Sequence, residues 1–234
     1  MARRITLVTH QAPMKDDRAS DHLVRLGYEL DWKTPCMGGA LGALTGDVAG
    51  TIVYGGKYCI SEIPDLPFMQ DEIRWLKACM QADLPVLGIC QGAQMIAHIL
   101  GAEVGPHPDG WHEFGYYPIE PTDEGRDFLP ETLYMTQSHF HEFQTPKDAR
   151  RLAKSALYGN QAFAWGDKVY GIQFHPEVTP AGFRRWQNAD WNAQVYGKPG
   201  VQSRAEQDRL CALHDDAMDR WFRGFLDTLF GPTG

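Results

Sequence analysis

The sequence predicts an α/β fold, a single domain with a mostly parallel, twisted open sheet, helices on both faces and a C-terminal helical extension. The first observation is a strand-helix-strand order, in which apolar residues 5–9 and 28–32 flank a helical pattern at 18–26. This order is typical of parallel sheets with right-handed crossovers. The second is an apolar run, residues 86–89, that leads directly into another helical pattern. The third is the length of 234 residues, which suits one large domain with a substantial core.

Charge and cysteine content argue against several classes of protein. The net charge is −8, and the absence of a basic cluster argues against a nucleic-acid or phospholipid partner. The five cysteines are irregularly spaced and include no C-x-x-C pair, so we expect no disulfide framework and a reducing, cytoplasmic location. No apolar run is long enough for a signal peptide or a membrane span.

The first strand and the third, residues 50–53, both end in segments that could face a ligand. His10 follows the first strand, at the edge where open α/β sheets bind ligands, and we expect a solvated loop histidine there. The third strand runs into Gly55-Gly56, a pair that lets the backbone turn and present N–H groups. A plain turn is the alternative. Residues 68–82 then form an amphipathic helix.

Cys90 stands at the corner between strand 86–89 and the helix that follows. Gly88 and Gly92 flank it in the pattern G-x-C-x-G, the cysteine form of a nucleophile elbow. The unpaired N–H groups of a helix start favour a thiolate over a thiol. Cys90 is therefore a candidate nucleophile, with a buried core cysteine as the competing interpretation.

A histidine and a carboxylate stand at the end of a second strand. Residues 162–165 and 169–174 form a predicted hairpin that leads into His175-Pro176-Glu177. Residues i and i+2 of an extended segment share a face, so Glu177 can orient one nitrogen of His175 while the other faces the thiol. The sequence thus predicts a nucleophile, a general base and an orienting acid in Cys90, His175 and Glu177.

Three motifs carry a family resemblance: Gly-Ile-Cys-Gln-Gly-Ala-Gln at 88–94, Phe-His-Pro-Glu at 174–177 and Tyr-Gly-Gly at 54–56. In this order and spacing they resemble the class I glutamine amidotransferase family, whose members use a Cys-His-Glu triad. The resemblance covers residues 5–190 and implies a flavodoxin-like sheet. Within the family, the sequence looks most like free-standing members, which include gamma-glutamyl peptidases.

The resemblance implies roles for further residues. The backbone N–H groups of Gly56 and Gln91 would form the oxyanion hole, and Gln94 would help hold the glutamyl end of the substrate. Phe140 stands where the family often has glycine, so its side chain would reshape the pocket and disfavour free glutamine. The alternative is that the side chain points into the core and that only its backbone meets the substrate. The other substrate-binding residues that the resemblance implies are Gly55, Ser138 and His139.

The activity expected from the resemblance is hydrolysis of a gamma-glutamyl amide through a thioester on Cys90, without a cofactor. Ammonia would pass to a separate synthetase, which makes the protein an amidotransferase. Alternatively, the protein acts alone as a gamma-glutamyl peptidase on small peptides or conjugates. Two further classes stay open, a cysteine α/β-hydrolase and a catalytically silent regulatory module.

Other histidines invite different interpretations. His139 and His141 alternate after a strand, which is typical of a metal site or of another general base. His107 and His112 lie in residues 102–133, a stretch rich in glycine and proline that we expect to be a substrate-gating loop. Ligand-like spacing is incomplete around His107 and His112, so we expect no metal there. At His139 and His141 the resemblance implies a substrate-binding backbone segment instead.

The C-terminal part departs from the family pattern. We expect an amidotransferase-like domain at 1–195, with a helix from Thr179-Pro180 to about residue 194, and a linker and a last helix at 196–234. A capping box at Ser203 and Glu206 opens that last helix. We expect it to pack on its own domain, with a homodimer interface as the alternative. Its predicted apolar stripe consists of Leu210, Leu213, Ala217, Trp221, Phe225 and Leu229.

Overall fold

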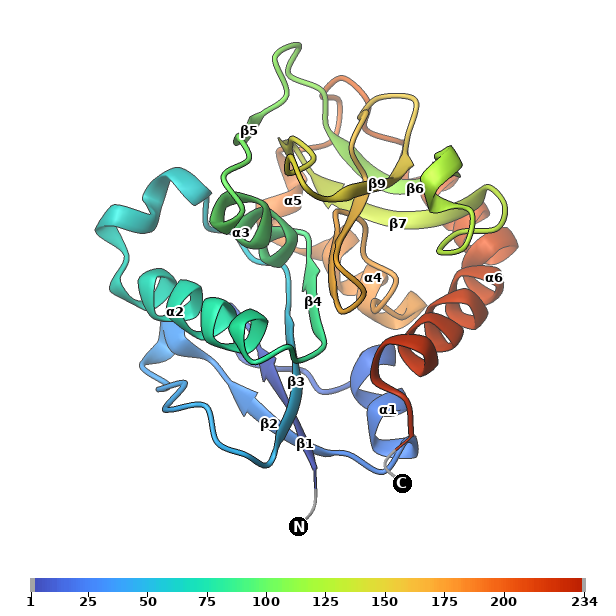
Figure 1. Ribbon diagram of the computed structural model, residues 1–234. Coiled ribbons are helices and arrows are strands. Elements are labelled where there is room, and N and C mark those ends of the chain that lie inside the picture. Colours follow the sequence, from blue (N-terminus) through green and yellow to red (C-terminus); the bar gives the residue numbers. More distant parts are fainter. Residues whose placement is uncertain (1–2, 233–234) are drawn as a thin grey trace.

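The computed structural model describes residues 3–232 and confirms the α/β class (Figure 1). Its main sheet has the strand order β2-β1-β3-β4-β11-β10-β9-β6-β7. These strands are β1 (Arg4–Val8), β2 (Glu29–Lys33), β3 (Val48–Val53), β4 (Val86–Ile89), β6 (Glu113–Pro121), β7 (Leu133–His139), β9 (Arg150–Lys154), β10 (Ala162–Trp165) and β11 (Val169–Ile172). A small antiparallel pair joins β5 (Val104–Pro106) to β8 (His141–Phe143).

The sheet is parallel in its first half and antiparallel in its second. Strands β2, β1, β3, β4 and β11 run parallel, and β10, β9, β6 and β7 continue the sheet in antiparallel fashion. In the register of β4 and β11, Ile89 pairs with Ile172. Because both strands are parallel, the residues that follow them, Cys90 and the segment leading to His175, leave the sheet at the same edge.

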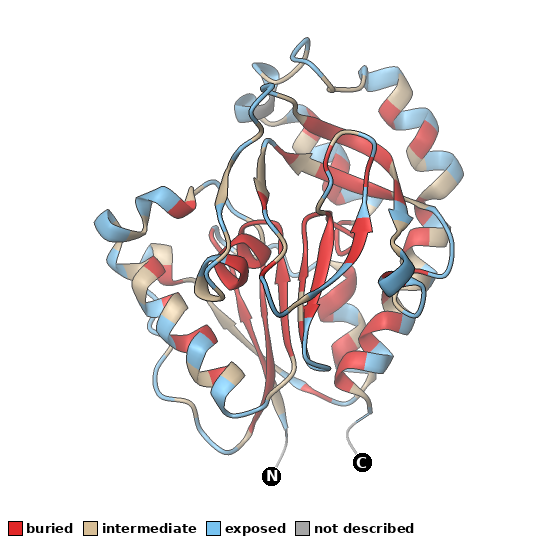
Figure 2. Ribbon diagram, turned by 45° about the horizontal axis from the view of Figure 1, so that its top comes forward, coloured by how far each residue is buried: buried red, intermediate tan, exposed pale blue. Residues whose placement is uncertain are grey.

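Helices cover both faces of the sheet. They are α1 (Arg18–Arg25), α2 (Pro67–Gln81), α3 (Gln91–Ile99), α4 (Pro180–Asn188), α5 (Asp190–Ala193) and α6 (Arg204–Phe230), with 3-10 turns at Pro35–Met37, Ile60–Asp65 and Asp123–Gly125. One apolar cluster joins the sheet to α1, α4 and α6, and a second joins it to α2 and α3. Figure 2 shows the buried strands between helices whose outer surfaces are exposed. None of the helices described in residues 3–232 is both long and apolar enough to cross a membrane.

The expectation of a gating loop at residues 102–133 was wrong, because β6 occupies nine residues of it. Phe114 and Tyr116 on β6 are buried, and β6 pairs with β7 along most of its length. Proline argues against a central strand, and β6 contains Pro118. The strand tolerates this proline because β9 pairs with β6 only at Glu120 and Pro121. Along most of the side of β6 that faces β9, backbone N–H groups are therefore not needed for pairing between strands.

Helix α6 packs against β6, β7 and α1, on the face of the sheet that carries α1 and α4. The predicted apolar stripe was partly wrong, since Leu213 is 62% exposed while Met218 and Phe222 are buried. The stripe was built mainly from steps of four residues, which drift around the helix by about 40° per step. The residues that are buried in the structure follow the 3.6-residue period of the helix. They include the charged residue Asp215.

The predicted helix starts at Thr179 and Ser203 are present. The side chain of Thr179 accepts a hydrogen bond from the N–H of Gly182, and that of Ser203 accepts one from Glu206. The first of these helices is interrupted at Ala189, so α4 and α5 replace the single helix expected up to about residue 194.

Candidate active site

Cys90 occupies the strand-to-helix corner that the sequence predicts. Its backbone has φ 52° and ψ −108°, a conformation that costs about 1–3 kcal/mol for a residue with a side chain. The flanking glycines make the corner possible: a Cβ on Gly88 would lie 2.5 Å from the carbonyl carbon of Gly92, and one on Gly92 would lie 2.0 Å from the oxygen of Val53. The thiol is thus held rigidly between β4 and α3, and Cys90 is 7% exposed.

His175 and Glu177 lie close to this corner, on the segment that follows β11. The N–H of His175 donates to the carbonyl oxygen of Thr136 at 2.7 Å, which fixes the backbone there. The Nδ1 of His175 lies 2.8 Å from Oε1 of Glu177, and the edge of the imidazole packs against Trp186. Both side chains are only 5% exposed, so the pair is shielded from solvent.

Gly55 lies against both Cys90 and His175. A Cβ on Gly55 would stand 2.7 Å from Cε1 of His175 and 3.3 Å from Cβ of Cys90. The imidazole and the thiol-bearing carbon therefore meet the same stretch of backbone. A side chain at position 55 would force the imidazole away, so the contact between nucleophile and base depends on a glycine here.

The charges around His175 favour its imidazolium form. Burial acts to lower the pKa, but the negative charges of Glu177 and of a Cys90 thiolate outweigh it, together with the hydrogen bonds to both side chains, and raise the pKa of His175 to about 10. At neutral pH the histidine is therefore protonated, and it lies beside the sulfur of Cys90. Such a pair can attack a carbonyl and then deliver a proton to a leaving nitrogen.

Removing either negative charge should lower the pKa of His175. We expect a larger fall in Glu177→Gln than in Cys90→Ala, because the negative charge of Glu177 is the largest single effect that raises the pKa. In the double variant burial acts alone, and the pKa should drop below its ordinary value. NMR titration of the imidazole carbon resonances would measure this, with the other histidines of each variant as internal controls. A His175 titration that is unchanged by both substitutions would contradict the electrostatic coupling.

The two residues expected to form the oxyanion hole lie next to one another. A Cβ on Gly56 would lie only 2.5 Å from Oε1 of Gln91, so the close approach of the Gln91 side chain requires glycine at position 56. The same Gln91 oxygen accepts a hydrogen bond from the N–H of Tyr58 at 3.0 Å. Gln91 thereby ties the start of α3 to the loop after β3. Its own N–H belongs to the first turn of α3, where helix N–H groups have no intrahelical acceptor.

The expectation that His10 is a solvated loop histidine was wrong. His10 is 5% exposed, donates from Nδ1 to the carbonyl oxygen of Gly55 at 3.1 Å, and places Nε2 at 3.0 Å from Oε2 of the fully buried Glu72. β1 is an interior strand, so the residue after it is covered by α2 and by the loop after β3. His10 therefore holds the carbonyl group of Gly55 in place, and Glu72 in turn fixes the orientation of the His10 ring.

His139 does not have a free nitrogen with which to act as a base. Its Nδ1 donates to the carbonyl oxygen of His141 at 2.9 Å, and its Nε2 lies 2.9 Å from Oε2 of Glu113. Glu113 also accepts hydrogen bonds from Ser155 and Gln161, so it is held in place by three side chains. His139 thus fixes the turn between β7 and β8. His141 lies 3.9 Å from the sulfur of Cys59, and burial lowers its pKa.

The remaining predicted substrate residues surround the turn between β7 and β8. Gln94 is buried and donates to Oε1 of Gln173 at 3.1 Å, with a longer contact to the carbonyl of His141. Ser138, half-buried at the end of β7, pairs with β6. Phe140 is 46% exposed and stacks on His112, with ring centroids 5.2 Å apart, so its ring lies on the surface rather than in the core.

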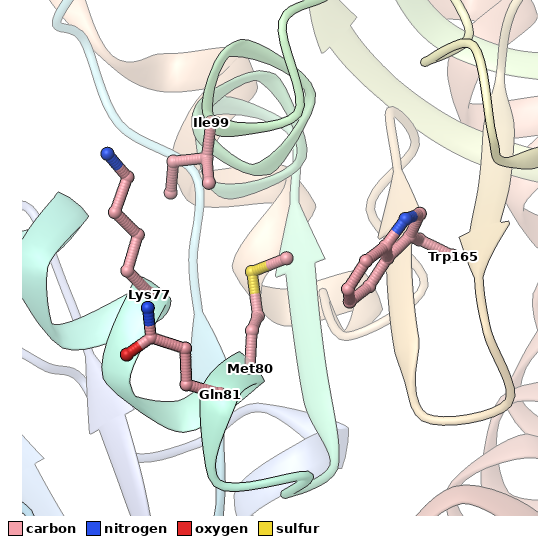
Figure 3. A pocket seen from close by; sticks show the side chains of 5 residues that line it. All are labelled: Lys77, Met80, Gln81, Ile99 and Trp165. Atoms are coloured by element: carbon pink, nitrogen blue, oxygen red, sulfur yellow. The ribbon is translucent and has the colours of Figure 1, made fainter.

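A surface cavity lies well away from these residues. It has a volume of about 340 Å³, and Figure 3 shows Met80 of α2 and Trp165 of β10 on opposite sides of it. Ile99, at the far end of α3 from Cys90, also lines it. Ile99 and Cys90 are separated by the length of α3, about 13 Å along the helix axis. Within residues 3–232, no group of three or more histidine, cysteine or acidic side chains is arranged to hold a metal ion.

Sequence reasoning missed His10, Glu72 and Glu113 as parts of this site. The single available signal was the position of His10 at the carboxyl end of a strand. Glu72 interrupts the apolar side of an amphipathic helix, and Glu113 lies in the stretch expected to be a loop.

Comparison with known proteins gives this site a family context. A family model described as "Glutamine amidotransferase class-I" matches residues 44–185. The chain is 37% identical over 142 residues to a glutamine-hydrolyzing GMP synthase of Anaplasma marginale, which covers 56% of this chain and 26% of that protein. It is 32% identical over 139 residues to one subunit of the glutamine-hydrolyzing GMP synthase of Archaeoglobus fulgidus, covering 58% of this chain and 70% of that protein. The match thus spans about a quarter of the first relative's length.

Solved structures match over the whole chain. A glutamine amidotransferase from Thermotoga maritima superposes with a TM-score of 0.86 at 25% identity, over 98% of this chain and 99% of that one. A glutamine amidotransferase from Methylobacillus flagellatus has a TM-score of 0.89 at 22% identity, over 100% and 96% respectively, and supports the fold. Since the family model spans more than half of the sequence, the chain belongs to the class I glutamine amidotransferase family.

Proposed function

We propose that this protein hydrolyses the amide bond of glutamine or of a small gamma-glutamyl compound through a covalent thioester on Cys90. The observation that carries the proposal is the strained corner at Cys90 facing the buried His175–Glu177 pair, with Gly55 in contact with both Cys90 and His175. A nucleophile, a base and an orienting acid in this arrangement are sufficient for amide hydrolysis.

In the first half of the reaction, the Cys90 thiolate attacks the carbonyl carbon of the amide. The negative charge that develops on the carbonyl oxygen would be stabilised by the N–H groups of Gly56 and Gln91. The imidazolium of His175 then gives its proton to the amide nitrogen, the C–N bond breaks, and ammonia or an amine leaves. The products of this half are a thioester and a neutral imidazole held by Glu177.

In the second half, water attacks the thioester while His175 accepts the proton of the water molecule. The C–S bond breaks, glutamate is released, and the imidazolium–thiolate pair is restored. Glu177 keeps the imidazole oriented throughout and stabilises its charge.

The fate of the leaving nitrogen distinguishes two forms of this activity. In the first, a separate synthetase receives ammonia, as suggested by the name of the Archaeoglobus fulgidus relative, which is one subunit of a GMP synthase. In the second, the protein acts alone as a gamma-glutamyl peptidase.

The proposal is tested by offering purified protein glutamine, glutathione and other gamma-glutamyl amides and measuring glutamate release. We expect release from at least one of them. Stimulation by an added synthetase would assign the amidotransferase form, and efficient release without one would assign the peptidase form. Failure to release glutamate from any of them, with or without a synthetase, would contradict the proposal.

Phe140 provides a prediction about substrate size. Its ring lies at the surface beside the turn between β7 and β8, where an amine larger than ammonia would find an apolar wall. We expect Phe140→Gly to raise kcat/KM for glutamine by about tenfold and to lower it for amides with bulky amines.

The control for this prediction is His112→Ala, which removes the stacking partner of Phe140 but leaves the ring in place. Steady-state kinetics of both variants, with thermal unfolding to check stability, would make the measurement. Unchanged kcat/KM for glutamine in a stable Phe140→Gly protein would show that the ring does not gate the site.

A further inference from the structure

Arg18, the first residue of α1, binds three successive carbonyl groups of the catalytic segment. Its backbone N–H donates to the oxygen of Glu177 at 2.8 Å, and Nη1 of its side chain donates to the oxygen of Pro176 at 3.2 Å and to that of Val178. The contacts to Pro176 and Val178 flank Glu177 on both sides, and Pro176 is the neighbour of His175. The backbone that carries the base and its orienting acid is therefore held by one residue.

The other side-chain nitrogens of Arg18 reach the C-terminal helix. Nη2 lies 2.5 Å from Oδ2 of Asp215, and Nε lies 3.0 Å from Oδ1 of Asp219, both on α6. Tyr116 on β6 donates to the second oxygen of Asp215 at 3.1 Å. The Arg18 side chain is 5% exposed and that of Asp215 is 12% exposed, so this pair is fixed with little contact to solvent.

A guanidinium is suited to this position because its donors form a rigid planar fork. All three nitrogens of the Arg18 guanidinium are engaged, with carbonyls on one side and carboxylates on the other. A lysine ammonium is a single point of charge and cannot serve both sides in the same geometry. The carboxylates of α6 also compensate a buried positive charge, which would otherwise be costly.

We propose that Arg18 is a positioning residue of the active site, through which Asp215 and Asp219 of α6 hold the His175–Glu177 segment against Cys90. This inference rests on the proposed function, and it gives the C-terminal helix a part in catalysis. If Arg18 no longer held this backbone segment, His175 and Glu177 would be displaced, although Arg18 itself makes no contact with the substrate. Since small displacements of catalytic groups are costly, we expect Arg18→Lys to lower kcat by about 10- to 100-fold and to leave KM within about twofold.

Asp227 on α6 offers a matched control. Its Oδ1 pairs with Nε2 of His22 of α1 at 2.7 Å, so it joins the same two helices, and in the described interactions its side chain contacts neither Arg18 nor the catalytic segment. Asp227→Asn should therefore perturb the packing of α1 on α6 and leave kcat unchanged. Thermal unfolding of both variants would show how much stability each substitution removes.

A second readout needs no substrate. Iodoacetamide alkylates a thiolate, forming a C–S bond and releasing iodide, and His175 lies next to Cys90 as the base that can take the proton of the thiol. At neutral pH, mass spectrometry of Cys90 should show alkylation slowed about tenfold in Arg18→Lys and unchanged in Asp227→Asn. Should Arg18→Lys fail to fold, Asp215→Asn keeps the arginine, weakens its anchor on α6 and should slow alkylation in the same direction.

The outcomes separate this inference from the proposed function. Slower alkylation in the Arg18 or Asp215 variant, with the Asp227 variant like wild type, supports the inference whether or not a substrate has been found. Wild-type alkylation and kcat in a folded Arg18→Lys or Asp215→Asn protein would overturn it. Equal losses in the Arg18 and Asp227 variants would also overturn it, because a general effect of helix packing would then explain both.

Discussion

Cys90→Ala will abolish hydrolysis of gamma-glutamyl amides, with a loss of at least about 1,000-fold in kcat. The substitution removes the one atom that can form the thioester, whereas the corner itself depends on Gly88 and Gly92. We expect the same loss in Cys90→Ser, because His175 and Glu177 are arranged around a thiolate and a hydroxyl is far less acidic. Glutamate release from wild type and both variants makes the comparison.

The control for this prediction is Cys79→Ala, which removes a buried thiol on α2 that belongs to the core. That variant should lose stability and keep kcat. Circular dichroism and thermal unfolding would show that the Cys90 variants remain folded. Retention of more than a few per cent of wild-type activity in a folded Cys90→Ala protein would contradict the assignment of the nucleophile.

Replacing His175 with alanine will cost nearly as much activity as losing Cys90. The imidazole is the group that passes the proton to the leaving nitrogen and takes one from water, and no other histidine is placed to do so among the contacts described for Cys90. Glu177→Gln should cost less, by a factor of about 10 to 100, because an amide can still orient the ring although it cannot stabilise the imidazolium.

His139→Ala tests whether the right histidine has been chosen. Both nitrogens of His139 are engaged, with the carbonyl of His141 and with Glu113, so its loss should destabilise the turn between β7 and β8. We expect KM to rise more than kcat falls. A His139 variant that is folded and loses more kcat than His175→Ala would show that His139 is the base.

The local parts of this site could be predicted from the sequence because each depends on near neighbours. The corner at Cys90 is specified by Gly88 and Gly92, two residues away on either side, and His175 and Glu177 share a face because they too are two residues apart. The parallel pairing of β4 with β11 then brings the two motifs to one edge of the sheet.

The long-range parts could not be predicted in this way. Arg18 meets Pro176 across 158 residues and Asp215 across 197 residues, and a charged residue at a helix start is ordinarily a solvated one. His10 and Glu72 are separated by 62 residues and are buried only as a pair. The fold tolerates these buried ionisable groups because each is paired with a group of opposite charge or with a hydrogen-bond partner. The partner is distant in the sequence, so it can be identified only from the folded structure.

The chemical state of Cys90 during turnover provides the most decisive measurement. Wild-type protein mixed with glutamine or a gamma-glutamyl amide should be quenched in acid and analysed intact and after digestion by mass spectrometry. The thioester mechanism predicts a mass increase of one gamma-glutamyl group, located on Cys90 and absent from Cys90→Ala. Two results would contradict that mechanism. One is glutamate release with the adduct on a residue other than Cys90, and the other is glutamate release without any adduct under conditions in which deacylation limits turnover.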